Sequence, residues 1–319
     1  MSKQKKILFG VDDSGFARQA LQKVGGLLKD SQDLEMILFH GASRPDFSFL
    51  PVNQEPVPLE YLWEHWESEA RQVLTNANNS LLKAGFDQER TSTVFDAKCR
   101  DPAESMLKLA IQEGIDTLAV ARWGTKTVSR YVIGPVTYRL SLQAENMALW
   151  VIDPRICSQN VLVCLVGAPV SKRVVDYTVN YFSHLRQSRF TFIHVTPPIP
   201  PQYWESEGFS SIEGAASIEG HEKEIARWLK EYTQNVKDIA DYGKKRMIEA
   251  GIPSENIHFK LVGQKMGLAR DIILELEEGD HGILVLGRKG FKAIKEFGLG
   301  SKAHKLLISS RAFIVCLVN

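Results

Sequence analysis

The apolar run KILFGVD at Lys6–Asp12 is echoed 154 residues later by NVLVCLV at Asn160–Val166. Each run is followed by a helix-like segment and then by a second apolar run. These segments are 17–28 and 34–40 in the first half of the chain, and 172–185 and 189–194 in the second. Because a fixed offset relates the two halves, the sequence predicts two repeats of one structural unit.

Both halves continue in the same order. A loop rich in Pro, Ser and aromatic residues leads into a long amphipathic helical stretch, at 59–84 and again at 221–250. A polar strand, another helix and a buried strand follow, and each half closes with a last apolar strand, at 147–152 and 312–318. Continuous Val, Ile and Leu runs that alternate with helices are typical of parallel strands buried on both faces.

We therefore expect an α/β fold of two tandem doubly wound, Rossmann-like domains, each with a five-stranded parallel sheet flanked by helices. The predicted domains are residues 1–154 and 155–319, which suits the usual domain size of about 150 residues. In such sheets a ligand binds beyond the carboxyl ends of the strands. The loops after the first and fourth strands of each half are therefore the places to look for a site.

The overall composition argues against several classes of protein. The chain is 44% hydrophobic and 24% charged, with a formal net charge of +1. Nucleic-acid binding generally needs a clustered excess of Lys and Arg, and a membrane-spanning helix needs about 20 consecutive apolar residues. The sequence shows neither pattern, and no secretory signal is visible. We therefore expect a cytoplasmic protein that binds neither nucleic acid nor membranes.

One glycine-rich loop carries the clearest chemical signal. After the fourth strand of the second half the chain reads GRKGFKAIKEFGLGS from Gly287 to Ser301, with the spacing G-x2-G-x9-G-S. Glycines let the backbone approach a phosphate closely, and Ser301 as a helix N-cap would offer a hydroxyl beside free N–H groups. Arg288 and Lys289 could add positive charge. The loop suits a di- or triphosphate, although a glycine-rich turn without a ligand has the same pattern.

On these residues the sequence resembles the universal stress protein (UspA-like) family, and specifically its tandem members, over nearly the whole chain. In ATP-binding members the loop has the motif G-x2-G-x9-G-[S/T], which Gly287, Gly290, Gly300 and Ser301 match in full. The family's first strand ends in V-D-x-S, whose Asp faces the adenosine. The first half has this motif as VDDS at Val11–Ser14, whereas the second half reads LVGA at the same place.

The resemblance implies an adenine nucleotide alpha hydrolase-like fold, with ATP or a related adenine nucleotide as the ligand and Mg²⁺ bound with it. It also implies that the last strands of the two halves pair with each other, as an intramolecular version of a family dimer, and it is compatible with a further homodimer. The nucleotide-binding residues that it assigns are Leu286, Gly287, Arg288, Lys289, Gly290, Gly300, Ser301, Lys302, Val195 and Val166.

The first half has the aspartate but an incomplete loop. It reads ARWG at Ala121–Gly124 and then GP at Gly134–Pro135, so two of the four motif positions are changed. Pro135 lacks the N–H that a phosphate would need, although it suits the first turn of a helix. Asp12 either caps the first helix or contacts a ligand, and we do not expect it to share a site with the complete loop. The degenerate first site would consist of Asp12, Gly124 and Gly134.

The remaining candidates have simpler explanations. His40 and His194 end the second strands at equivalent positions, but neither has a catalytic partner in sequence, so a structural role is favoured. A solvated helical position is favoured for His304, and Trp123 is expected to pack. Aromatic residues of the two long loops would form lids or docking surfaces, or cover the sheet: Phe47, Phe49, Tyr203, Trp204 and Phe209. Those of the long helices are spaced for packing: Trp63, Trp66, Trp228 and Tyr232.

Two functions stay open. We find no Ser-His-Asp order and no metal-ligand cluster, so we expect no catalytic residue, no metal ligand and at most weak ATP hydrolysis. The first hypothesis is a stress-response regulator that binds ATP or a related nucleotide through its second half and acts on protein partners. The second is a nucleotide-independent interaction protein, or a binder of a small hydrophobic, lipid-like ligand in a cleft beside Val166 and Ala168.

Overall fold

The computed structural model describes residues 4–42, 59–124, 133–155, 157–166, 168–196, 215–288 and 299–319. The elements of the first half are β1 (Lys5–Gly10), α1 (Gly15–Leu28), β2 (Leu34–Gly41), α2 (Leu59–Lys83), β3 (Thr91–Asp96), α3 (Pro102–Gln112), β4 (Thr117–Ala121), α4 (Pro135–Gln143) and β5 (Ala148–Ile152). Those of the second half are β6 (Val161–Cys164), α5 (Ala168–Phe182), β7 (Phe190–Thr196), α6 (Ala215–Glu249), β8 (Ile257–Gly263), α7 (Leu268–Glu278), β9 (Ile283–Gly287), α8 (Ser301–Ser309) and β10 (Ile314–Val318). Strands and helices alternate in the order that the repeat predicts.

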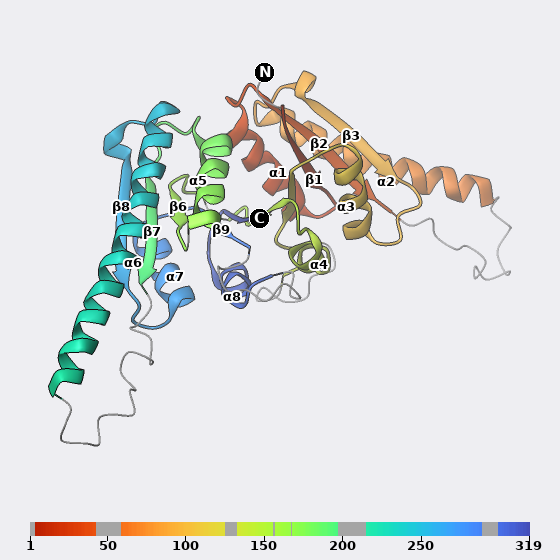
Figure 1. The fold of residues 1–319 in the computed structure, drawn as a ribbon. Helices are drawn as coiled ribbons and strands as arrows, with labels where there is room; N and C mark the ends of the chain where they lie inside the picture. The colour runs from red at the N-terminus through yellow and green to blue at the C-terminus, as the bar shows by residue number, and fades with distance from the viewer. Residues whose placement is uncertain are drawn as a thin grey trace.

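The strands of the described residues form one ten-stranded sheet in the order β3-β2-β1-β4-β5-β10-β9-β6-β7-β8. Pairing is parallel within each half, whereas β5 and β10 are antiparallel, with Ile152 opposite Ile314 and Leu149 opposite Leu317. The prediction of two tandem doubly wound α/β units is confirmed. The two halves lie side by side (Figure 1), and their last strands pair as expected.

Helices cover both faces of this sheet. The core on one face includes buried residues of α1, α2, α5 and α6, and the core on the other includes buried residues of α3, α4, α7 and α8. The central strands are buried on both faces, as their continuous apolar runs predict. In Figure 1, α2 and α6 extend beyond the sheet on opposite sides of the molecule.

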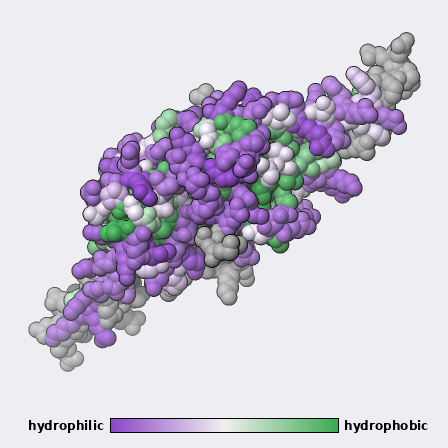
Figure 2. Space-filling view, turned by 90° about the horizontal axis from the view of Figure 1, so that it is seen from above, coloured by the Kyte–Doolittle hydropathy of each residue, from purple (hydrophilic) through white to green (hydrophobic). Residues whose placement is uncertain are grey.

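Hydrophilic residues predominate on the face shown in Figure 2, with hydrophobic patches between them. No helix in the described part of the chain combines the length and the apolar character that crossing a membrane requires.

The junction between the halves is packed around Trp150 of β5. This side chain is fully buried, and its ring stacks on Phe182 of α5 with 5.2 Å between the ring centroids. Its Nε1 donates a hydrogen bond to Tyr177 Oη, also on α5, at 2.7 Å. Because β5 and α5 belong to different halves, these contacts stabilise the junction between the two halves.

A second set of polar contacts lies beside this stack. The Tyr181 hydroxyl donates a hydrogen bond to Asp116 Oδ1 at 2.5 Å. Thr117 Oγ1 lies 2.9 Å from the hydroxyl oxygens of both Tyr177 and Tyr181. Burial raises the pKa of both tyrosines, so they stay neutral and can donate or accept hydrogen bonds at neutral pH. The interface is therefore hydrogen-bonded as well as apolar.

Replacing Tyr177 by Phe tests this network. The change removes the acceptor of the buried Trp150 N–H, so we expect the free energy of unfolding to fall by about 1–3 kcal/mol. Tyr61→Phe is the matched control, because Tyr61 is 61% exposed and its loss should change stability by less than about 0.5 kcal/mol. Urea unfolding of both variants measures the difference, and equal effects would contradict a stabilising network at the junction.

Candidate functional site

The second-half site that the sequence predicts lies at the carboxyl edge of the sheet, where β6 runs between β7 and β9. Val195 near the end of β7 and Leu286 near the end of β9 are buried, and Gly287 ends β9. Val166, just beyond β6, is half-buried. The three strands therefore bring these residues to one edge. The predicted site residues Lys289 and Gly290 lie outside the described residues.

The N-terminus of α8 differs from the prediction by one residue. Ser301 is the first helical residue, and the N-cap is Gly300, with φ −65° and ψ 142° and no side-chain capping bond. Gly300 N donates a hydrogen bond to Arg288 O at 3.0 Å, which closes the loop between β9 and α8. The first N–H groups of a helix have no intrahelical acceptor, so those of Ser301 and Lys302 can face an anion. Both residues are exposed.

Arg288 is placed differently from the prediction that it adds charge beside a phosphate. Its side chain is fully buried, and Nη1 donates a hydrogen bond to the carbonyl oxygen of Ser141 on α4, in the first half. Burial lowers the pKa of the guanidinium to about 10, so it remains charged at neutral pH. We therefore leave Arg288 out of the nucleotide site, because it fastens the start of the glycine loop to the other half.

The first half contains an equivalent arginine. Arg122 follows β4 as Arg288 follows β9, and it is 3% exposed. Its Nη1 donates to Leu307 O at 2.7 Å and its Nη2 donates to Ser310 O at 3.3 Å, at the C-terminal end of α8. Each loop thus begins with an arginine that contacts the end of a helix from the opposite half, where the helix dipole favours a cation. Sequence reasoning missed this role, although Arg at the same place in both halves was an available signal.

Asp12 supports the cap of α1 but is not the cap itself. Ser14 is the N-cap, and its Oγ accepts a hydrogen bond from Ala17 N at 3.0 Å. Asp12 Oδ1 accepts hydrogen bonds from Ser14 N at 3.1 Å and from Ser14 Oγ at 2.5 Å. The other oxygen of this carboxylate faces Gly124, where even a methyl group would collide with it. The structure therefore brings Asp12 and Gly124 together.

The described residues of the first-half loop pack against their neighbours. Gly134 is the buried N-cap of α4 and Pro135 occupies its first turn, as expected. Trp123 is buried, with its ring centroid 5.6 Å from that of Phe16 and the Arg155 guanidinium 4.2 Å from its centroid. The prediction that Trp123 packs is confirmed.

Asp12 and the complete glycine loop are at different edges of the sheet. Because β5 and β10 pair antiparallel, the carboxyl ends of the strands in one half point away from those in the other. Asp12 follows β1, whereas Gly300 follows the loop after β9. The prediction that the two do not share a site is confirmed.

The two equivalent histidines have structural partners. His40 Nδ1 lies 2.9 Å from Val11 O, and His194 Nδ1 lies 2.9 Å from Leu165 O. Each histidine therefore links the ends of two neighbouring strands. Burial lowers the pKa of His194, which keeps the ring neutral at pH 7.

Other aromatic residues also pack where they are described. Trp63 and Trp66 are half-buried, and the Trp66 ring centroid lies 5.9 Å from that of Phe95. His304 is half-buried, and its ring centroid lies 6.2 Å from that of Tyr138 of the first half, with the two rings close to perpendicular. The side chains outside the described residues are Phe47, Phe49, Ala168, Tyr203, Trp204, Phe209, Trp228 and Tyr232. Within the described ranges no three His, Cys, Asp or Glu side chains are placed to hold a metal ion.

Known proteins share this architecture. Residues 3–151 match the model of the universal stress protein family. The chain is similar in fold to a universal stress protein from Archaeoglobus fulgidus DSM 4304, with a TM-score of 0.61 and 15% identity over 99% of each chain. It is also similar to a putative universal stress protein from Pseudomonas aeruginosa UCBPP-PA14, with a TM-score of 0.51 and 14% identity over 98% of this chain and 92% of that one. No curated protein matches the sequence.

The fold and these likenesses define a tandem α/β protein made of two similar halves. The first half therefore matches the universal stress protein family in sequence, and the second half repeats the same fold.

The buried His194 predicts a pH dependence of stability. Its pKa in the folded protein is lowered by burial, so the unfolded chain binds more protons once the pH falls below about 6.5. Stability is therefore lost as the pH falls through this window towards the folded pKa. His184 and His281, whose pKa values burial also lowers, act in the same direction.

We expect urea unfolding between pH 7.5 and 5.5 to show a smaller loss of stability for His194→Gln than for the unchanged protein. The control is His65→Gln, because the His65 side chain is 62% exposed on α2. A His194→Gln curve parallel to that of the unchanged protein would contradict the assignment of this histidine as buried and neutral.

Proposed function

We propose that the protein is a stress-response regulator that binds ATP or a related adenine nucleotide through its second half. The observation that carries the proposal is the N-terminus of α8, which follows a complete G-x2-G-x9-G-S loop and has Gly300 in place of a capping side chain. N–H groups at the positive end of a helix dipole bind phosphate. The resemblance to ATP-binding family members supports an adenine nucleotide as the ligand.

The phosphate end of a nucleotide fits these residues. Gly300 presents backbone without a Cβ, and the exposed Ser301 and Lys302 add a hydroxyl and a positive charge. Mg²⁺ would be held by the phosphates and would offset their negative charge. It would not need a cluster of protein ligands.

The adenosine end has fewer polar partners. Val166, Val195 and Leu286 supply an apolar surface, and the Val166 amide already donates a hydrogen bond to Ser171 Oγ at 2.8 Å. The second half has Val166 where the first half has Asp12, so no carboxylate follows this strand to contact a ribose. We therefore propose that the phosphates supply most of the binding energy and that specificity for the base is low.

The first half is a poor nucleotide site for two reasons. Pro135 has no N–H at the first position of α4, and the carboxylate of Asp12 packs against Gly124. The negative charge of Asp12 at this place would also repel a phosphate. We propose that binding is confined to the second half.

Arg288 offers a route by which binding could act on the rest of the protein. It follows the first motif glycine, Gly287, and contacts Ser141 of the other half. A nucleotide that binds one arrangement of the loop more tightly shifts the population of that arrangement, and with it the surface that partners meet. We further propose a cytoplasmic location, folding domains at 1–154 and 155–319, protein partners in the stress response, and a homodimer as the assembled form.

Gly300→Ala and Gly134→Ala form a matched pair that tests the nucleotide site. Both glycines are helix N-caps with negative φ, which alanine also adopts, so thermal melting should show that both variants fold. In calorimetry with ATP and Mg²⁺, we expect Gly300→Ala to weaken binding at least about tenfold, or about 1.4 kcal/mol, because its methyl group keeps the phosphate away from the backbone. Gly134→Ala should bind like the unchanged protein.

Gly290→Ala extends the test to the second motif glycine. If no ATP binds at millimolar concentration, or if Gly134→Ala loses binding while Gly300→Ala retains it, the proposal is wrong. The absence of binding would favour the nucleotide-independent interaction protein.

A further inference from the structure

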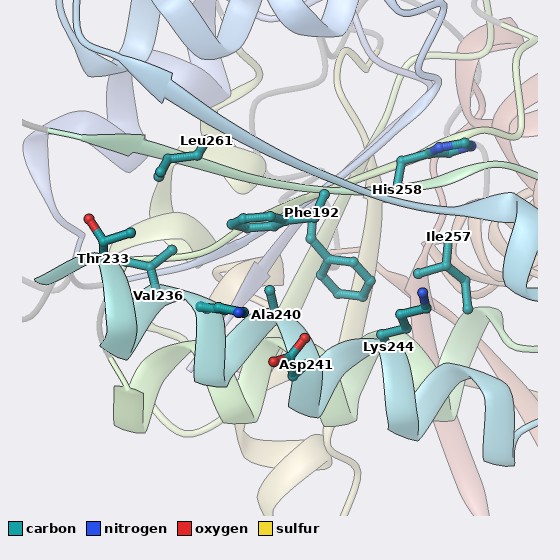
Figure 3. A pocket seen from close by; sticks show the side chains of 11 residues that line it. Phe192, Thr233, Val236, Ala240, Asp241, Lys244, Ile257, His258 and Leu261 are labelled. Carbon is teal, nitrogen blue, oxygen red and sulfur yellow. The ribbon is translucent and has the colours of Figure 1, made fainter. Parts of the chain in front are cut away.

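A groove lies between α6 and the edge strand β8, on the face of the sheet that carries α5 and α6. Its volume is about 360 Å³, within the range of small-molecule sites. In Figure 3, Ile257 and Leu261 line the groove from β8, and Val236 and Ala240 line it from α6. Phe192 of β7 lies between the strand and the helix. The start of α8, with Gly300 and Ser301, lies elsewhere, because α8 packs on the opposite face of the sheet.

One residue that lines the groove is smaller than its equivalent in the first half. The sequence offset between α2 and α6 places Ala240 where the first half has Leu74. Leu74 is 5% exposed and belongs to the core between α2 and the sheet. An alanine at this place leaves a hollow that the surrounding backbone does not close. The smaller side chain of Ala240 therefore contributes to the opening at this point.

The edge strand makes the groove apolar. Ile257, Phe259 and Leu261 alternate along β8 and share one face, and Phe259 and Leu261 are 41% and 46% exposed. In the first half, the residue equivalent to Leu261 is Phe95, which Trp66 covers at 5.9 Å between ring centroids. Exposed apolar side chains beside a hollow are a feature of ligand sites.

The rim of the groove carries an excess of positive charge. Lys237 and Lys244 stand two turns apart on α6, with Asp241 between them. In the first half, the residue equivalent to Lys237 is Arg71, which pairs with Glu67 at 2.6 Å. The second half has a threonine in place of that glutamate, and neither lysine forms an ion pair with any described residue. Both ammonium groups are exposed and can meet an anion.

From this juxtaposition we propose that the α6–β8 groove binds an amphiphilic carboxylate, with its hydrocarbon chain against Phe192, Phe259 and Leu261. The carboxylate lies at the rim, where Lys237 and Lys244 attract it more than Asp241 repels it. The small volume suits a medium-chain fatty acid. This site is separate from the nucleotide site and does not depend on it.

The test measures binding of decanoate and octanoate to the full chain by calorimetry, with 1-octanol as the uncharged match to octanoate. We expect saturable binding of one molecule per chain, with octanoate tighter than octanol. Ala240→Leu restores the leucine that the first half has at the equivalent place and fills the hollow. It should weaken decanoate binding at least about tenfold and leave the melting temperature unchanged or higher.

A second pair of variants tests the charges. Lys237→Gln combined with Lys244→Gln should weaken octanoate binding several-fold and leave octanol binding unchanged. Lys245→Gln is the control, because the Lys245 side chain is 76% exposed and pairs with Glu249. Equal decanoate binding by Ala240→Leu and the unchanged protein would overturn the proposal, as would octanol binding as tightly as octanoate. A dimer in sedimentation that Ala240→Leu abolishes would assign the groove to a second copy of the chain and would also overturn it.

Discussion

The antiparallel pairing of β5 with β10 is the constraint on which the rest of the structure depends. Each half alone would end its sheet in an apolar strand with an unpaired edge, and such edges expose backbone groups that must find partners. Both strands are fully buried in the joined sheet. Trp150 and the tyrosines of α5 then fill the space beside the junction. The pairing also fixes the two carboxyl edges, and so the two potential sites, on opposite sides of the sheet.

Within this shared frame the halves have diverged in complementary ways. The first half has Asp12 but uses it to support the cap of α1, and Trp123 after β4 is buried. The second half has the complete G-x2-G-x9-G-S sequence and an open groove at the place where Leu74 packs in the first half. Arg122 and Arg288 have the same role in the two halves, because each donates a hydrogen bond to the end of a helix in the other half. The arginine contacts at the junction are therefore symmetric, whereas the surfaces available to ligands are not.

The alternation of strands and helices in each half could be predicted from sequence because a repeated apolar pattern marks the strands that are buried on both faces. The pairing across the halves was expected from the resemblance to the family and not from the pattern. Local sequence could not place the cap of α8, since Gly300 and Ser301 are both suitable residues at neighbouring positions. Local sequence also suggested that Arg288 contacts a phosphate. It could not show that the side chain binds the end of α4, because α4 is far away in the chain. The groove could not be predicted either, because it depends on how Leu74 and Ala240 pack at equivalent places in the folded halves. These differences all depend on contacts between elements far apart in the chain.

Native-state hydrogen exchange of the backbone amides of β5 and β10 tests the central claim most directly. If the halves form one sheet that unfolds as a unit, the paired amides of Trp150, Val151, Val315 and Cys316 should be among the slowest to exchange, at the rate of global unfolding. If these amides exchange faster than those at the centre of β1 and β9, the halves separate before either unfolds. That result would contradict the account of a single continuous sheet.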